Sequence, residues 1–409
     1  MRGGRRLLVA KNKLGKLITA YKKNEQEISQ LRHESFTCPE CNEKVILKAG
    51  RIKVPHFAHE QQSSCSVRQG ESAEHLNGKI DIEQWCQYRG YPSALEYALP
   101  EVGQRIDVVA RIGKTTVAFE YQCAPISLEE YESRTNGIRK AGFMPVWIFG
   151  VQYLNALYNH SFRLSPLMKA AIMKEPPFKQ PILLFYSTPQ KRLTILSQFF
   201  SSKFKCFVQR SHLSLQKVGI ETFQNMPMNV PLSSFKTYWL KEKQRLRTMQ
   251  RKHISELDKR FMLMLYQQYL HPQYLPACVH LPVQSSYRLL VPNYIWQTQF
   301  LLSCWRQKNI GEYISWTEAL KSCNELFTNT ITTQHSTHSI HPLYEYLTLL
   351  SSFGYLKKSP QGWVVLKHPR FPKTLDEALV FDKNILTYFG ETIMKKRSFF
   401  LQSMETAIK

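Results

Sequence analysis

The stretch QRIDVVARIGKTTVAFEYQ, residues 104–122, constrains the fold and the chemistry of this chain more than any other segment. Its two runs of β-branched and aromatic residues flank Gly113 and Lys114. This pattern predicts two antiparallel strands joined by a two-residue turn. In the register that such a turn imposes, Asp107 lies directly opposite Glu120, so the hairpin carries two carboxylates on one face while its other face is apolar.

Two carboxylates at that spacing repel each other, and each is costly to bury alone. A divalent cation would remove both penalties, because the hard oxygen ligands of Asp107 and Glu120 suit Mg²⁺ or Mn²⁺. Such an ion can activate water and stabilise a phosphoryl transition state. Gln122 lies two residues after Glu120 and shares its face. The alternative is a solvated sheet face, and the hairpin alone does not decide between the two.

A predicted helix precedes the hairpin and carries a polar stripe. Glu71, Glu74, His75, Gly78 and Lys79 follow at helical spacing, so they line one side of this helix. An acid and the histidine of this stripe can join a metal site at the hairpin. The alternative is an exposed helix surface on which glutamates pair with lysines.

The elements of residues 71–150 follow one another in the order α-β-β-β-α-β. The helix ends near Gly90, a short strand ends at Pro100, and the hairpin follows. Ser127 and Glu130 form a capping box that predicts a second helix. The apolar run MPVWIFG is then typical of a buried strand.

A cluster of cysteines and histidines lies before this region. Cys38 and Cys41 form a Cys-x-x-Cys pair, and His56, His59 and Cys65 follow within 25 residues. Two cysteines of such a pair with two of the later residues make a tetrahedral zinc site. We predict a structural zinc ion held by Cys38, Cys41, His59 and Cys65, with His56 as the competing histidine. The alternative is that these residues are merely buried.

The charge of the chain indicates a polyanionic partner. The formal net charge is +24 over 409 residues, which is typical of proteins that bind nucleic acid. No apolar run approaches the roughly 20 residues needed to cross a bilayer. We therefore expect no membrane insertion and a cytoplasmic location, where clustered cysteines favour metal binding over disulfides.

The remainder of the chain is basic and rich in aromatic residues. The run at 236–260 reads as a helix that either contacts phosphate groups or presents a solvated face. Residues 340–370 read as helix, strand, turn and strand, an outline that resembles a winged-helix module. Trp239, Trp305 and Trp363 either stack on unpaired bases or belong to the core.

The motifs FTCPEC, PHFAH, GESAEHLNGK, QRIDVVA, FEYQ and ESRT, taken in order, identify a family. The sequence resembles the competence protein CoiA family, and through it the PD-(D/E)XK nuclease-like superfamily. The resemblance implies an α/β nuclease-like core of order α-β-β-β-α-β, an N-terminal Cys/His zinc unit and a mainly helical C-terminal region. We expect a basic segment at 1–35, the zinc unit at 36–70, the nuclease-like domain at 71–155 and the helical region at 156–409.

The resemblance also implies roles for the site residues. Asp107 and Glu120 take the metal-binding carboxylate positions. Glu74 supplies the helix acid, with His75 nearby and Glu71 as the competing choice. Gln122 stands where most of the superfamily has lysine, and a glutamine can hydrogen-bond an attacking hydroxide but cannot stabilise it by charge.

The function implied is promotion of recombination of internalised single-stranded DNA during natural transformation. DNA and a RecA-type recombinase are the implied partners, and Mg²⁺ or Mn²⁺ with structural Zn²⁺ are the implied cofactors. Two hypotheses follow: a metal-dependent deoxyribonuclease, or a non-catalytic mediator that binds DNA and recombinase on a degenerate nuclease scaffold.

Overall fold

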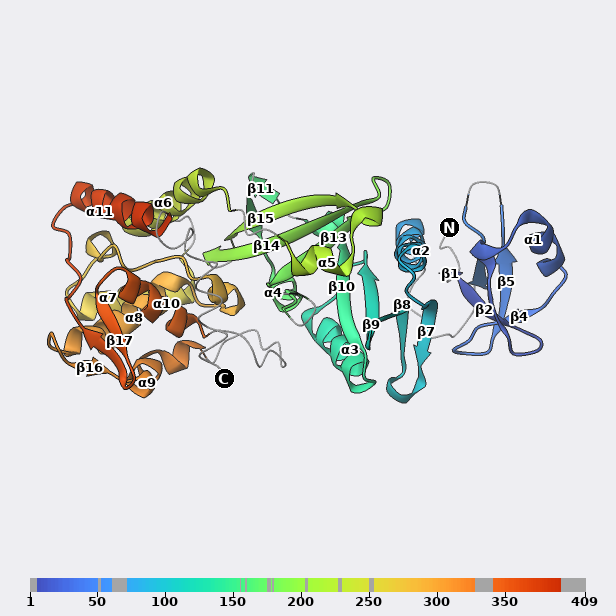
Figure 1. Ribbon diagram of the computed structural model, residues 1–409, viewed down its shortest axis with the longest axis horizontal. Helices are drawn as coiled ribbons and strands as arrows, with labels where there is room; N and C mark the ends of the chain where they lie inside the picture. The colour runs from blue at the N-terminus through green and yellow to red at the C-terminus, as the bar shows by residue number, and fades with distance from the viewer. Residues whose placement is uncertain are drawn as a thin grey trace. The chain divides into compact units, whose positions relative to one another are not determined.

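The computed structural model describes residues 6–50, 53–60, 72–154, 156–158, 160–174, 178, 180–202, 205–226, 230–249, 254–327 and 341–390 (Figure 1). The chain divides into two compact units. The first takes residues 1–154, 176–195 and 211–226, and the second takes 155–175, 196–210 and 227–409. Strands β14 and β15 contribute residues to both units. No described helix is both long enough and apolar enough to cross a membrane.

The first unit begins with a six-stranded sheet in the order β1-β6-β5-β4-β2-β3. Its elements are β1 (Arg6–Leu7), β2 (Val9–Asn12), β3 (Leu17–Thr19), η1 (Ala20–Lys22), α1 (Glu25–Leu31), β4 (Phe36–Thr37), β5 (Lys44–Lys48) and β6 (His56–His59). Leu7, Phe36 and Phe57 form its core together with residues of α1. Strands from the expected basic segment and from the expected zinc unit thus share one sheet, so we describe these residues together.

The rest of the first unit is an α/β domain. Its elements are α2 (Ala73–Tyr88), β7 (Ser93–Leu99), η2 (Pro100–Val102), β8 (Gln104–Ile112), β9 (Thr115–Gln122), α3 (Leu128–Lys140), β10 (Met144–Gly150), η3 (Val151–Tyr153), β13 (Ile182–Ser187), η4 (Leu215–Lys217) and α5 (Ile220–Gln224). The run from α2 to β10 has the expected order of helices and strands. Strands β7, β8 and β9 are antiparallel, whereas β9 pairs with β10, and β10 with β13, in parallel.

Helices α2 and α3 cover opposite faces of this sheet. Trp85 of α2 packs edge-on against Phe119, on the face that the sequence predicted to be apolar. Ile138 of α3 packs against Val109 and Ala118 on the other face. Because Glu120 alternates with Phe119 along β9, its side chain belongs to the α3 face. Because α3 covers this face, the alternative of a solvated face is wrong, and the metal-binding alternative stays a prediction.

The second unit holds the strands β11 (Ala156–Tyr158), β12 (Ser161–Arg163), β16 (Tyr313–Ile314), β17 (Leu356–Ser359) and β18 (Gly362–Val365). It also holds residues 196–202 of β14 (Arg192–Ser202) and residues 205–210 of β15 (Lys205–Ser214). Its helices are α4 (Pro166–Ala170), α6 (Leu232–Thr248), α7 (Glu256–Gln267), η5 (Pro272–Tyr274), η6 (Gln284–Arg288), α8 (Asn293–Ser303), η7 (Trp305–Gln307), α9 (Trp316–Phe327), α10 (Pro342–Ser352) and α11 (Leu375–Tyr388). Strands β11, β12, β15 and β14 are neighbours in this order.

One expectation for the C-terminal region needs correction, and one open alternative is decided. The mainly helical region was expected from residue 156, but residues 156–214 contain β11 to β15 and helices dominate only from Leu232. The apolar runs ILLFYS and LTILSQFF have the composition of buried strands, and their pairing depends on strands distant in the sequence. In addition, Trp239, Trp305 and Trp363 are at most 3% exposed, so they belong to the core.

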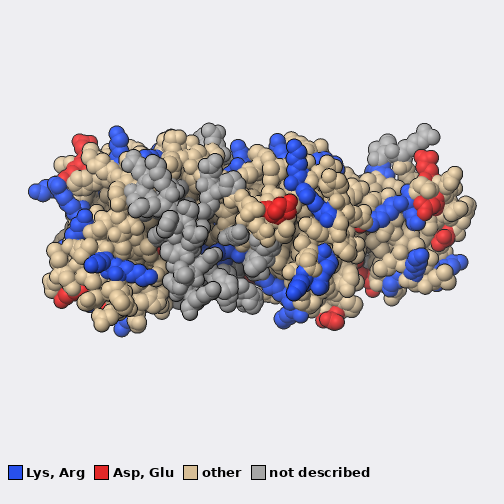
Figure 2. Space-filling view, viewed as in Figure 1, with Lys and Arg blue, Asp and Glu red and all other residues tan. Residues whose placement is uncertain are grey.

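The basic run in α6 is only partly exposed. Lys243 and Arg247 are buried, and both pair with Asp382 of α11, at 3.2 Å and 2.6 Å respectively. Lys241 and Arg245 remain exposed. The prediction of a solvated face therefore holds for one side of α6. The basic residues on the other side form buried ion pairs that hold α6 to α11. On the face of the molecule shown in Figure 2, lysine and arginine side chains are widespread and acidic ones are sparse.

Candidate functional site

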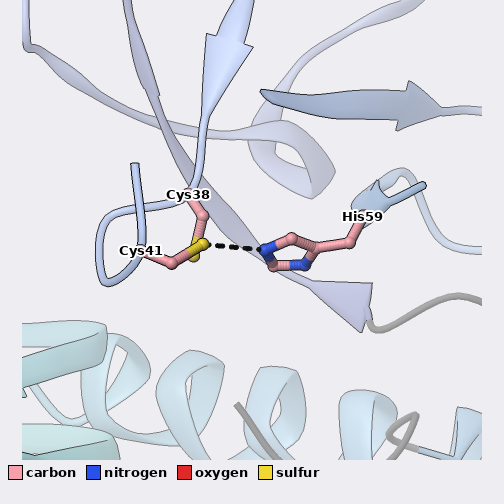
Figure 3. A group of neighbouring side chains, drawn as sticks. All are labelled: Cys38, Cys41 and His59. Carbon is pink, nitrogen blue, oxygen red and sulfur yellow. Dashed lines mark hydrogen bonds between the residues drawn. The ribbon is translucent and has the colours of Figure 1, made fainter. Parts of the chain in front are cut away.

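Cys38, Cys41 and His59 come together in the N-terminal sheet (Figure 3). Cys38 directly follows β4, Cys41 lies in the turn before β5, and His59 ends β6. Their ligand atoms all lie within 4.8 Å of one another, and Cys41 Sγ is 3.3 Å from His59 Nε2. Among the described residues, these three form the one group of at least three His, Cys, Asp or Glu side chains whose ligand atoms lie close enough together to hold a metal ion.

The backbone of the turn fixes the two thiols. Cys38 N–H donates to the Glu43 carbonyl at 2.8 Å, and Asn42 N–H donates to the Cys38 carbonyl at 3.0 Å. Asn42 adopts a φ of 58°, a left-handed conformation that asparagine tolerates better than most residues. Glu40, between the two cysteines, lies 3.3 Å from Arg105 of β8.

The donor set fits zinc. Two thiols and an imidazole are three of the four ligands of a tetrahedral site, and Cys65 lies outside the described residues. Burial raises the pKa of the Cys38 thiol, a penalty that a bound cation would reverse. His56 is directed elsewhere, because its Nδ1 lies 2.8 Å from the Val54 carbonyl. Of the two competing histidines, the structure places His59 with the cysteines.

The β8–β9 hairpin has the predicted register. Ile112 pairs with Thr115, and the ladder continues to Val108 and Phe119. At the next step Asp107 Oδ2 accepts the backbone N–H of Tyr121 at 2.9 Å. The Asp107 carboxylate therefore bonds directly to the backbone of β9.

Asp107 is 7% exposed and is surrounded by cations. His75 Nε2 of α2 lies 3.1 Å from Asp107 Oδ2. Burial acts to raise the pKa of Asp107, but the charges of His75, Lys79 and Arg134 together lower it below its usual range. Asp107 is thus ionised at neutral pH and is available as a metal ligand or as an acceptor for a protonated histidine.

Glu120 is 1% exposed and pairs with Arg134 of α3. Burial raises the pKa of Glu120 to about 7; the nearby Asp107 charge adds to this rise and Arg134 opposes it. The guanidinium of Arg134 also lies 5.5 Å from the centre of the Trp147 ring. Glu120 Oε1 is buried and has no hydrogen-bond partner among the described residues. A buried carboxylate oxygen in that state is a suitable ligand for a hard cation.

The polar stripe of α2 faces the sheet, so the alternative of a solvated Glu–Lys surface does not hold for it. Gly78 lies against the Tyr121 ring so closely that an added Cβ would overlap it. Glu74 Oε1 lies 3.4 Å from the Tyr121 hydroxyl, which also lies 3.2 Å from the Tyr186 carbonyl. Glu71 lies outside the described residues.

Gln122 is buried at the end of β9. Its Nε2 donates to the Ala124 carbonyl at 2.5 Å. In this arrangement the amide supports the loop after β9.

Two residues beside the acids were not assigned a role from the sequence. Arg134 stands in the ESRT motif of α3, a helix that begins after the N-cap Ser127, whose side chain accepts the backbone N–H of Glu130. Lys79 follows His75 at i+4; it is fully buried, and its Nζ lies 2.7 Å from Glu96 Oε1. The helical spacing could have indicated Lys79, whereas the partner Glu96 depends on how α2 packs.

Comparisons with known proteins give one consistent result. Three domain models of the competence protein CoiA family match consecutive parts of the chain: the N-terminal domain at 20–68, the nuclease-like domain at 71–227 and the C-terminal domain at 235–379. The chain is also 28% identical over 353 residues to a protein of Bacillus subtilis (strain 168) described as "Competence protein CoiA". That match covers 84% of this chain and 93% of the relative. No solved structure matches significantly.

Proposed function

Because the chain belongs to the competence protein CoiA family, we propose that it acts in natural transformation by processing internalised single-stranded DNA for recombination. It would work in the cytoplasm with a RecA-type recombinase, on a PD-(D/E)XK nuclease-like core. The observation that carries the proposal is the pair of buried carboxylates, Asp107 and Glu120, at the end of the β8–β9 ladder in the nuclease-like domain. A structural zinc ion at Cys38, Cys41 and His59, with Cys65 as the fourth ligand, would stabilise the adjoining sheet.

A divalent ion held by Asp107 and Glu120 would supply activated water and charge neutralisation for phosphodiester hydrolysis. The chain's own residues prepare that site. Tyr121 N–H and His75 fix the Asp107 carboxylate. Arg134 neutralises Glu120 while no ion is bound, and the same guanidinium can contact a phosphate oxygen when Glu120 serves as a ligand.

The test is cleavage of labelled single-stranded, duplex and branched DNA with Mg²⁺ or Mn²⁺. Wild-type protein is compared with Asp107→Ala, Asp107→Asn and Glu120→Ala. The matched control is Glu101→Ala, an exposed carboxylate in η2. We expect cleavage by the wild type and the control, and its loss in the three site variants. Failure of the wild type to cut any of these substrates with either metal would refute the catalytic proposal.

A second candidate function is a non-catalytic mediator that binds DNA and recombinase. Two points favour it. The resemblance puts Gln122 at the usual lysine position, and the Gln122 amide donates to the Ala124 carbonyl. In addition, Arg134 forms an ion pair with Glu120. Under this hypothesis Asp107→Ala, if folded, keeps transformation in cells at the wild-type level. A loss of transformation with normal folding would instead favour catalysis.

A further inference from the structure

Residues 293–365 of the second unit have the element order and sheet pairing of a winged helix. The order is α8, β16, α9, α10, β17, β18, and the three strands pair as β16-β18-β17. In a winged helix the helix at the position of α10 is the one that commonly enters the major groove of duplex DNA, as in the related helix-turn-helix modules. If this module binds DNA as such modules commonly do, α10 must be accessible to the major groove.

Helix α10 is not free to enter a groove. Each of its residues is buried or half-buried. Its Glu345 accepts the backbone N–H groups of Gln284 and Ser285 at 2.7 Å and 2.9 Å, and the Ser285 hydroxyl at 2.6 Å. The chain thus covers α10 with its own η6 segment and places a carboxylate there. Both features disfavour base-edge reading in duplex DNA.

One side of α10 contributes a ring to a group that we call the Trp316 surface: Trp316 of α9, Tyr344 of α10 and Lys358 of β17. Trp316 opens α9 and is half-buried, with its ring centre 6.1 Å from that of Tyr344. Exposed Lys358 of β17 has its Nζ 5.1 Å from the Tyr344 ring centre and 2.5 Å from its hydroxyl. A cation next to partly exposed rings is the composition that binds a phosphate and an adjacent unpaired base.

Trp363 forms the floor of this surface. Its ring lies 5.6 Å from Tyr344 and 6.3 Å from Trp316. It is 3% exposed, and its indole N–H has no hydrogen-bond partner among the described residues. Trp363 therefore supports the two outer rings from below and is not itself available for stacking. Glu318, in the first turn of α9, is paired with Lys308 at 2.8 Å, so its charge opposes an anionic ligand only weakly.

We propose that the Trp316 surface binds unpaired nucleotides of single-stranded DNA: Trp316 and Tyr344 stack on bases, and Lys358 contacts a phosphate. This inference rests on the proposed function, because it takes DNA as the substrate. Beyond the proposed function, this inference names the surface that binds single-stranded DNA. It also predicts that this surface prefers single strands to duplex DNA. It does not depend on cleavage at Asp107.

The experiment measures binding of a fluorescent 20-nucleotide oligo(dT), and of a 20-base-pair duplex, to the full chain without Mg²⁺ or Mn²⁺. The variants are Trp316→Ala, Trp316→Phe and Lys358→Ala. Lys357→Ala is the matched control, because Lys357 is also exposed on β17 but alternates to the opposite face of the sheet. Tyr266→Ala controls for loss of an exposed aromatic side chain, since Tyr266 is 78% exposed on α7.

We expect Trp316→Ala to weaken oligo(dT) binding by about 5- to 100-fold, and Trp316→Phe to restore most of it. Lys358→Ala should reduce the salt dependence of binding by about one phosphate contact, and Lys357→Ala should not. Duplex binding should change less than twofold. Oligo(dT) affinity within twofold of wild type for both Trp316→Ala and Lys358→Ala overturns the proposal. Equal losses on single-stranded and duplex DNA also overturn it.

If oligo(dT) affinity is unchanged but Trp316→Phe lowers transformation in cells, the surface binds a protein partner, and the proposal is wrong. Absence of cleavage by the wild type would count against the nuclease function only. The two failures are distinguishable because binding is measured without the metals that cleavage requires. Circular dichroism at matched temperature identifies any variant that is not folded.

Discussion

Replacing Lys79 by methionine should destabilise the first unit strongly and in a pH-dependent way. Lys79 is fully buried, and its Nζ lies 2.7 Å from Glu96 Oε1. The other oxygen of Glu96 accepts the backbone N–H groups of Leu8 and Val9, each at 3.1 Å. The substitution keeps the length of the side chain but leaves a buried carboxylate without its cation.

Removing one partner of a buried ion pair costs about 3–5 kcal/mol. Because Glu96 keeps two backbone donors, we expect the lower end, about 3 kcal/mol at pH 7, which is roughly a 150-fold decrease in the folding constant. The double variant Lys79→Met with Glu96→Gln should recover more than half of the loss, because no buried charge remains. Lys114→Met, at the exposed hairpin turn, should change stability by less than about 0.5 kcal/mol.

The pH dependence gives the sharper test. Burial acts to raise the pKa of Glu96, but Lys79 and Arg105 hold it below its ordinary value. In the wild type this carboxylate therefore stabilises the fold above its unfolded pKa, and the contribution is lost as pH falls through the folded pKa. Without Lys79 burial dominates, so Glu96 protonates more readily in the folded state and the variant loses less stability on acidification.

Urea unfolding followed by tryptophan fluorescence at pH 7 and pH 5 measures both quantities. We expect the difference in unfolding free energy between wild type and Lys79→Met to shrink at the lower pH. A difference below about 1 kcal/mol at pH 7, or an equal difference at both values, would refute the reasoning.

Three further predictions concern the two candidate sites. Cys38→Ser should abolish zinc in the purified protein, measured by atomic emission, and chelators should then no longer lower the melting temperature; zinc retention would contradict the ligand assignment. Gly78→Ala should destabilise the fold by about 1–3 kcal/mol in urea unfolding because the added methyl overlaps the Tyr121 ring, whereas helix propensity alone predicts a gain. Arg134→Met should destabilise the fold by about 3 kcal/mol at pH 8, since Glu120 is buried; an unchanged melting temperature would show that Glu120 is neutral there.

The parts of the site that depend on neighbouring residues were predictable from the sequence. The turn at Gly113 fixes the pairing from Ile112 to Val108, and helical spacing puts Glu74 and His75 on one side of α2. The Cys-x-x-Cys spacing likewise placed Cys38 and Cys41 together. In each instance a few consecutive residues determine the geometry.

The parts that depend on packing between distant elements were not predictable. The partner of Glu120 is Arg134, which reaches it only because α3 lies on that face of the sheet. The pairing of β10 with β13 needs a strand more than 30 residues away in the chain, and no local pattern links the two. For Trp239 of α6 and Trp363 of β18, the spacing of apolar residues in the sequence did not show whether the ring lies in the core or is free to stack on a base.

Helix α2 also sets a length constraint on the chain. His75, Lys79 and Glu83 follow at intervals of four: His75 contacts Asp107, Lys79 contacts Glu96, and Glu83 receives donors from Tyr21, Lys22 and Gln87. Inserting one residue between Lys79 and Glu83 would rotate the later turns by about 100° and shift them by about 1.5 Å. Either the N-terminal sheet or the hairpin carboxylate would then lose its contacts. Insertions and deletions within this helix are therefore tolerated much less than substitutions on its exposed side.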